Sequence, residues 1–244
     1  MGEYTTAGFG ATINGKHTWK DYGLVISNTD IVSEPSPKTN YIEVPGSSIR
    51  IDLTETLTGQ VEYESRQLKF SLGKMEREDL WPVFYRTFLK AYQGKEVRVV
   101  LDQEPDVYYH GRAEVSGFSR NGRLGTFTLT IDADAYKYEL NVSSEDWLWD
   151  ILNFETGIIR DYRGISVSGS SSKLLEGSGI PVVPAFLVSN LDESVSNYIT
   201  FNGTRYTLQE GQNRFADLII PAGGGRLYFY GKYTVNIEFR GGSL

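Results

Sequence analysis

Apolar residues recur at every second position in three segments between residues 67 and 133. They are Leu68, Phe70 and Leu72 in the first segment, Ala113, Val115 and Gly117 in the second, and Phe127, Leu129 and Ile131 in the third. Because successive side chains of a strand point to opposite faces, this spacing predicts strands over 67–72, 107–119 and 125–133, each with one buried face. The pair Asn121-Gly122 favours a hairpin turn between the last two. The chain must therefore build an antiparallel sheet whose apolar face is covered.

One segment, from about residue 77 to residue 93, has the spacing of a helix that could cover such a sheet. Its apolar stripe consists of Leu80, Phe84, Phe88 and Ala91/Tyr92, and it is widened by Trp81, Tyr85 and Leu89. Asp79 is the expected N-cap, Pro82 fits only the first turn, and Gly94 stands where a helix often ends. We expect the stripe to pack on the sheet, because core packing is a far commoner role for such a stripe than binding a cofactor.

The character of the chain changes near residue 139. From there on, short predicted strands follow one another at regular spacing, with turns that contain Gly-Ser, Asn202-Gly203 and a run of glycines at 223–225. This pattern is typical of an antiparallel β-sandwich. We therefore predict a mainly β protein with two domains. Residues 1–138 form an α+β domain with one helix (about 77–93), and residues 139–244 form an antiparallel sandwich.

Composition excludes several classes of function. The chain has no cysteine, which rules out disulfides, thiolate metal sites and a cysteine nucleophile. Its formal net charge is −7 and it has no run of lysines or arginines, so a surface that binds nucleic-acid phosphates is disfavoured. The N-terminus lacks the features of a signal peptide, and no apolar run reaches the ~20 residues of a membrane-spanning helix. A soluble protein made in a cytoplasm, without membrane insertion, is expected.

The segment Asp102–Arg112 is the strongest candidate for a chemical site, because three carboxylates, a histidine and an arginine crowd together there. A calcium loop that begins at Asp102 would need Gly at its sixth position and Glu at its twelfth, where this chain has Val107 and Ala113. A zinc site usually has two or more His or Cys ligands, and nothing in the sequence brings the second histidine, His17, near this segment. We therefore predict no metal ligands, no cofactor-binding residues and no catalytic residues.

The favoured interpretation of this segment is an acidic turn over 102–106, followed by a strand. Alternation then puts Tyr109, Gly111, Ala113 and Val115 on one face of that strand, and Tyr108, His110 and Arg112 on the other. In this interpretation Asp102, Asp106, His110 and Arg112 serve turn or subunit contacts. Trp147 and Trp149 are candidate glycan contacts, although sealing the junction between the two domains is the favoured role for them.

Several segments, taken in order, resemble one known family. They are Phe9-x-x-x-Ile13-Asn-Gly-Lys-His17, Asp21-Tyr-Gly-Leu-Val-Ile26, Val44-Pro-Gly46, Ile51-Asp-Leu-Thr-Glu55, Tyr63-x-x-Arg66, Gly94-Lys, Asp102-x-x-Pro-Asp-x-Tyr-Tyr-x-Gly-Arg112 and the ending Ile237-Glu-Phe-Arg-Gly-Gly-Ser-Leu244. Together they resemble the distal tail protein (Dit) family of siphophages and related prophages of Gram-positive bacteria. The resemblance covers residues 9–138 best and returns at the C-terminal tail, which suggests that the last strand returns towards the first domain. The loop Pro45–Ile49 departs from the family, which often has Pro-Gly-Arg-Asn-Gly there.

The resemblance implies a structural protein of the virion, assembled in the bacterial cytoplasm and located at the tail tip. In this family the first domain forms a hexameric ring, and the second projects outward as a galectin-like sandwich. The ring joins the tail-tube protein to the tail-tip and receptor-binding proteins, and DNA passes through it. A non-enzymatic role follows. The alternatives are a carbohydrate-binding β-sandwich protein that recognises a cell-wall glycan, and a glycoside hydrolase whose carboxylate pair sequence spacing alone cannot locate.

Overall fold

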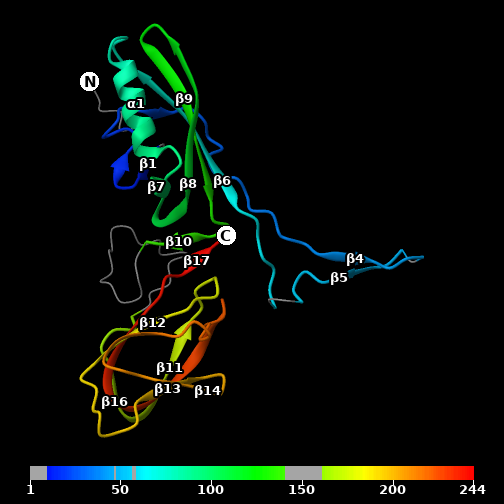
Figure 1. The fold of residues 1–244 in the computed structure, drawn as a ribbon, viewed down its shortest axis with the longest axis vertical. Helices are drawn as coiled ribbons and strands as arrows, with labels where there is room; N and C mark the ends of the chain where they lie inside the picture. Colours follow the sequence, from blue (N-terminus) through cyan, green and yellow to red (C-terminus); the bar gives the residue numbers. More distant parts are fainter. Residues whose placement is uncertain (1–9, 47, 57–58, 141–160) are drawn as a thin grey trace. The chain divides into compact units, whose positions relative to one another are not determined.

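The computed structural model describes residues 10–46, 48–56, 59–140 and 161–244 (Figure 1). The chain divides into two compact units, one ending at Lys137 and the other spanning Tyr138–Ser243. Both consist mainly of antiparallel strands, and the described residues contain a single α-helix. The predicted mainly β fold with one helix is therefore confirmed. Within these residues, no helix has the length and apolar character required to cross a membrane.

The first unit is built on one twisted antiparallel sheet. Its strands are β1 (Ala11–Ile13), β2 (Lys16–His17), β3 (Val25–Ile26), β6 (Arg66–Met75), β7 (Glu96–Leu101), β8 (Glu104–Asn121) and β9 (Leu124–Ala133). They follow the order β2-β1-β7-β8-β9-β6-β3. The register pairs Phe70 with Leu129 and Ala113 with Ile131, so the predicted apolar positions share one face. That face forms the core of the unit.

Helix α1 (Trp81–Tyr92) covers the apolar face of this sheet (Figure 1). Its buried residues are Trp81, Phe88 and Tyr92, and Phe88 contacts Phe127 of β9 at 5.0 Å between ring centroids. The predicted core packing is confirmed for Phe88 and Tyr92, but it is wrong for Leu80, which is 43% exposed. The predicted N-cap is wrong, because the capping position is held by Leu80 without a side-chain hydrogen bond. The Asp79 carboxylate instead pairs with the guanidinium of Arg77 at 2.8 Å.

An exposed hairpin is inserted in the chain between β3 and β6, which pair with each other in the sheet (Figure 1). Its strands β4 (Tyr41–Glu43) and β5 (Arg50–Asp52) pair only with each other. Closer to the sheet, isolated bridges join Pro37 to Tyr63 and Val32 to Leu68. The chain from residue 33 to residue 65 is called the arm below, and among its described residues (33–46, 48–56 and 59–65) no third strand pairs with this two-stranded ribbon.

The second unit contains one six-stranded antiparallel sheet. The strands are β11 (Ile165–Glu176), β12 (Ala185–Ser189), β13 (Tyr198–Phe201), β14 (Thr204–Thr207), β15 (Gly211–Arg214) and β16 (Gly224–Glu238). The order is β14-β13-β16-β12-β15, and β11 pairs with β16 along its whole length. At the end of the unit β17 (Gly242–Ser243) pairs with β10 (Lys137–Glu139). The Arg240 guanidinium donates to the carbonyl oxygens of Glu139 and Leu140, which holds the last residues beside the first ones.

Two glycines bend this sheet around its core. Strand β16 pairs with β13 through residues 228–230 and with β12 through residues 234–238. Between these two stretches, Gly231 (φ 122°) lies opposite Gly169 (φ 86°) of β11. Positive φ at both positions is a conformation that glycine adopts without steric cost. One continuous pair of strands can therefore contribute to both halves of the bent sheet.

The side chain of Asn197 fills the gap that this bend leaves between β12 and β13. Its Oδ1 accepts a hydrogen bond from the Lys232 amide at 2.9 Å. Its Nδ2 donates to the carbonyl oxygens of Asp192 at 2.7 Å and Val195 at 3.0 Å. Asn197 is buried, so these bonds replace the ladder hydrogen bonds that are missing at the bend.

Candidate functional site

The turn in the segment 102–112 is shorter than predicted. Only Asp102 and Gln103 form the turn, and Glu104 already begins β8, which continues through Pro105. The alternation after the turn is confirmed. The residues on the buried face are Tyr109, Gly111, Ala113 and Val115, and on the opposite face His110 and Arg112 are exposed.

The two histidines lie near different carboxylates, and one of these contacts was not expected. Nε2 of His17 lies 3.1 Å from Oδ2 of Asp102. Nδ1 of His17 accepts hydrogen bonds from the amides of Trp19 and Lys20, both at 3.1 Å. Because Nδ1 is an acceptor, the ring proton is on Nε2 and is donated to Asp102. Pairing of β1 with β7, which sets Ala11 opposite Leu101, brings these distant residues together.

The hydrogen bond between His17 and Asp102 joins the β1–β2 hairpin to the β7–β8 turn. A Cβ on Gly10 would come within 2.3 Å of Asp102 Oδ2 and 2.6 Å of His17 Cε1, so the contact requires glycine at position 10. Over residues 10–46, 48–56, 59–140 and 161–244, no three His, Cys, Asp or Glu side chains group in a way that could hold a metal ion.

The other residues predicted to make subunit contacts also lie at the surface of this sheet. Nδ1 of His110 is 3.3 Å from Oδ2 of Asp134. The Arg112 guanidinium pairs with Glu96 at 2.7 Å and donates to the Gly94 carbonyl at 2.6 Å. Asp106 is half-buried in β8. A role of Asp102, Asp106, His110 and Arg112 between subunits stays a prediction.

A polar cluster on the opposite side of β8 was not predicted. The Glu104 carboxylate accepts hydrogen bonds from Lys137 Nζ and from the Tyr109 hydroxyl, both at 2.6 Å. Burial raises the pKa of this carboxyl, but the two hydrogen bonds outweigh burial and leave the pKa below its ordinary value. Arg66, only 5% exposed, lies over the Tyr109 ring and donates to the Ala135 carbonyl. The cluster ties the ends of β6, β8 and β9 together.

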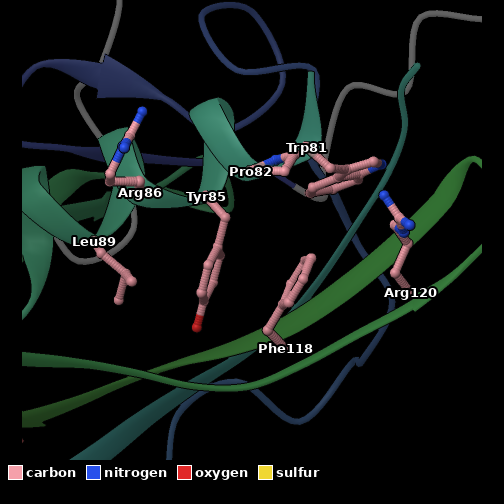
Figure 2. A pocket seen from close by; sticks show the side chains of 7 residues that line it. All are labelled: Trp81, Pro82, Tyr85, Arg86, Leu89, Phe118 and Arg120. Carbon is pink, nitrogen blue, oxygen red and sulfur yellow. The ribbon is translucent and has the colours of Figure 1, made fainter. Parts of the chain in front are cut away.

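The first unit has a hollow lined mainly by aromatic and apolar side chains, which we call the groove (Figure 2). Its volume is about 530 Å³, and it is lined by Trp81, Pro82, Tyr85, Arg86, Leu89, Phe118 and Arg120. Five of these residues come from α1 and two from the outer part of β8. The rings of Tyr85 and Phe118 stack with centroids 4.3 Å apart.

A β-bulge in β8 creates the groove. The β8–β9 register shifts between Ser116 and Ser119, where Gly117 has a φ of +67°. The extra residue reverses the alternation, so that Phe118 turns towards the helix. The prediction that Gly117 shares the buried face with Val115 is therefore wrong, because Gly117 is exposed at the bulge.

Two arginines lie at the rim of the groove (Figure 2). Nη1 of Arg120 donates to the Glu78 carbonyl at 2.9 Å, and the Arg86 side chain is exposed. In the part of the chain that the structure describes, neither guanidinium forms an ion pair with a carboxylate. The groove thus combines an aromatic floor with positive charge. Trp147 and Trp149, the predicted glycan contacts, lie outside the described residues.

The fold is similar to that of a solved phage protein. The crystal structure of SPP1 Dit (gp 19.1), described as a paradigm of the hub adsorption apparatus in phages that infect Gram-positive hosts, matches this chain with a TM-score of 0.59. The match covers 97% of this chain and 99% of that chain, at 14% sequence identity. No family model and no curated protein sequence matches the chain. At this identity the likeness establishes a shared fold.

Proposed function

We propose that the protein is a structural hub of a siphophage tail tip. In this proposal residues 1–138 form a ring, hexameric as in the Dit family, and residues 139–244 project from it. The ring joins the tail tube to the tail-tip and receptor-binding proteins and lets DNA pass. The observation that carries the proposal is the match to SPP1 Dit over nearly the whole length of both chains, because it includes both units and not merely a common sandwich.

The physical character of the first unit supports assembly with other chains. The arm carries exposed apolar residues, and its strands β4 and β5 pair only with each other, which leaves their outer edges without a neighbouring strand. Exposed strand edges and apolar ribbons recruit neighbouring chains, which makes them useful in an assembly and hazardous in a monomer. The net charge of −7 suits a conduit through which DNA must pass without adhering.

Two measurements test this proposal. Native mass spectrometry and negative-stain imaging of the purified full chain should give a closed hexameric ring with cyclic symmetry, as the resemblance to the Dit family implies. Gold-labelled antibodies against the chain should mark the tail tip of the virions that carry its gene. Labelling of capsids alone, or of no particle, would contradict the proposal even if the chain self-associates.

A carbohydrate-binding role for the second unit is a second candidate. Tyr198 and Tyr230 stack at 4.6 Å on adjacent strands, Arg205 lies 3.6 Å over the Tyr198 ring, and Tyr228 is exposed close by. Sugars bind to such exposed aromatic faces through apolar contacts. Binding to a cell-wall glycan array that is lost in Tyr228→Ala, and kept in the matched surface variant Leu174→Ala, would support this role. Equal binding by both variants would exclude this aromatic surface as the site.

A further inference from the structure

The arm is an amphipathic ribbon without a core of its own. Ile42 lies opposite Ile51 in the β4–β5 register, and Val44 and Ile49 continue the same alternating positions. The exposed fractions are 50% for Ile42, 49% for Ile51, 37% for Val44 and 71% for Ile49. A two-stranded hairpin alone is at best marginally stable in water, and four β-branched side chains on one face need another surface to cover them.

The opposite face of the arm is polar and already satisfied. Tyr41 pairs with Asp52 and Glu43 with Arg50 across the strands, and the Arg50 guanidinium lies 4.2 Å over the Tyr41 ring. The side chain of Asp52 caps its own turn by accepting from the Thr54 amide at 2.9 Å. This face needs no partner, so the two faces of the ribbon differ in the way expected of a segment that docks through one face.

The groove on the first unit is complementary to this apolar face in chemistry and in charge. Its floor is aromatic, with the stacked rings of Tyr85 and Phe118 between α1 and β8. Between residues 34 and 64 the arm carries six acidic residues and two basic ones. Arg86 and Arg120 at the rim have no carboxylate partners among the described residues. An acidic apolar ribbon is therefore matched to a positively charged aromatic groove.

We propose that the arm of one copy of this chain docks, through the face formed by Ile42, Val44, Ile49 and Ile51, into the groove of a second copy. The two surfaces are different, so the contact is head-to-tail, and repetition of such a contact generates a closed ring when the rotation closes. This inference rests on the proposed ring and names the surfaces that join its subunits. It also assigns Arg86 and Arg120 a role, as the charges that face the acidic arm.

The absence of cysteine from the chain permits a clean cross-linking test. Full-length Ile42→Cys and full-length Leu89→Cys chains are mixed in equal amounts and oxidised. A disulfide-linked dimer of one chain of each kind is expected, and peptide mapping should place the bond between positions 42 and 89. The matched control replaces Leu89→Cys by Leu174→Cys, an exposed apolar position on the second unit, and should give no specific dimer.

A second measurement guards against a cross-link formed by chance collision. Ile42→Ser/Ile51→Ser should weaken self-association on the order of tenfold or more in sedimentation, because it removes the centre of the apolar face. Leu187→Ser/Ile219→Ser, which changes equally exposed residues of the second unit, should leave association unchanged. All four substituted positions are exposed, so the variants should keep the fold, and circular dichroism checks that they do.

The outcomes separate this inference from the proposed function. Rings that form without a 42–89 cross-link, and that tolerate Ile42→Ser/Ile51→Ser, would overturn the docking of arm into groove and leave the ring intact. A chain that stays monomeric at every soluble concentration and gives no cross-link would overturn the docking as well. In that case, labelling of the tail tip still decides independently whether the protein is a tail component.

Discussion

Replacing Gly231 by alanine should destabilise the second unit more than any other single methyl addition at its bend. The φ of Gly231 is 122°, a region that is essentially restricted to glycine. An added Cβ would lie 2.2 Å from Oδ1 of Asn197 and 2.9 Å from its Cα. Since Cβ atoms do not approach other atoms this closely, Asn197 would have to move and give up the hydrogen bonds that close the bend.

The expected cost has two parts. Backbone strain at such a φ costs ~1–3 kcal/mol. Displacing Asn197 breaks its hydrogen bonds to the Lys232 amide and to the carbonyls of Asp192 and Val195, and buried polar groups left without partners cost ~1–3 kcal/mol. We therefore expect Gly231→Ala to lower the free energy of unfolding by roughly 2–6 kcal/mol, a large share of the stability of a typical domain.

Gly169→Ala is the matched control. Gly169 lies opposite Gly231 in the same ladder and also has a positive φ, but a Cβ there would meet no atom within 4 Å. Only the strain remains, so a loss of ~1–2 kcal/mol is expected. Urea unfolding of the full chain gives the free energies, and hydrogen exchange with mass spectrometry assigns the loss to residues 165–238. Equal losses in the two variants would refute the role given to Asn197.

Three further predictions concern the first unit. Glu104→Gln should lower the free energy of unfolding at neutral pH. The pKa of Glu104 in the folded protein lies below its ordinary value, so the stability that the carboxylate contributes should be present above pH ~4.3 and lost as the pH falls through the folded pKa. Urea unfolding of the two proteins at several pH values measures this difference. Gly125→Ala should cost ~1–3 kcal/mol, because its Cβ would lie 2.4 Å from the Trp81 ring, and an unchanged free energy of unfolding in urea would contradict this packing. Asp102→Ala should cost ~1 kcal/mol through loss of the His17 hydrogen bond, whereas Asp102→Asn, which keeps an acceptor, should cost less in thermal unfolding.

The sequence is informative wherever burial is decided by local spacing. The strands β6, β8 and β9 and helix α1 each bury one face, and burial of one face imposes a period of two or of 3.6 residues that can be read without a structure. The hairpin turn at Asn14-Gly15 is equally local, because φ is positive at both residues and few other pairs of residues tolerate that.

The features that the spacing of apolar residues could not predict depend on which strands pair or on the conformation of a single residue. The His17–Asp102 contact spans 85 positions and requires β1 to pair with β7, which no local pattern specifies. The bulge at Gly117 adds one residue to β8, and a glycine inside an alternating strand signals a bulge only weakly. The bulge turns Phe118 towards α1, so the groove could not be predicted from an alternation that continues unchanged through Gly117.

The arm has the local sequence pattern of a hairpin, but its apolar residues are not buried by the rest of the chain. Polar and apolar residues alternate in its strands, and its turn carries Gly46 at a φ of 78°, so the local sequence is compatible with a hairpin. Yet the alternation buries nothing within this chain, since both strands are exposed on both faces. An apolar face is stabilising only where water is removed from it. The residues Ile42 and Ile51 are therefore explained by a surface outside their own chain, and conflicts of this kind between local pattern and fold are expected where function resides.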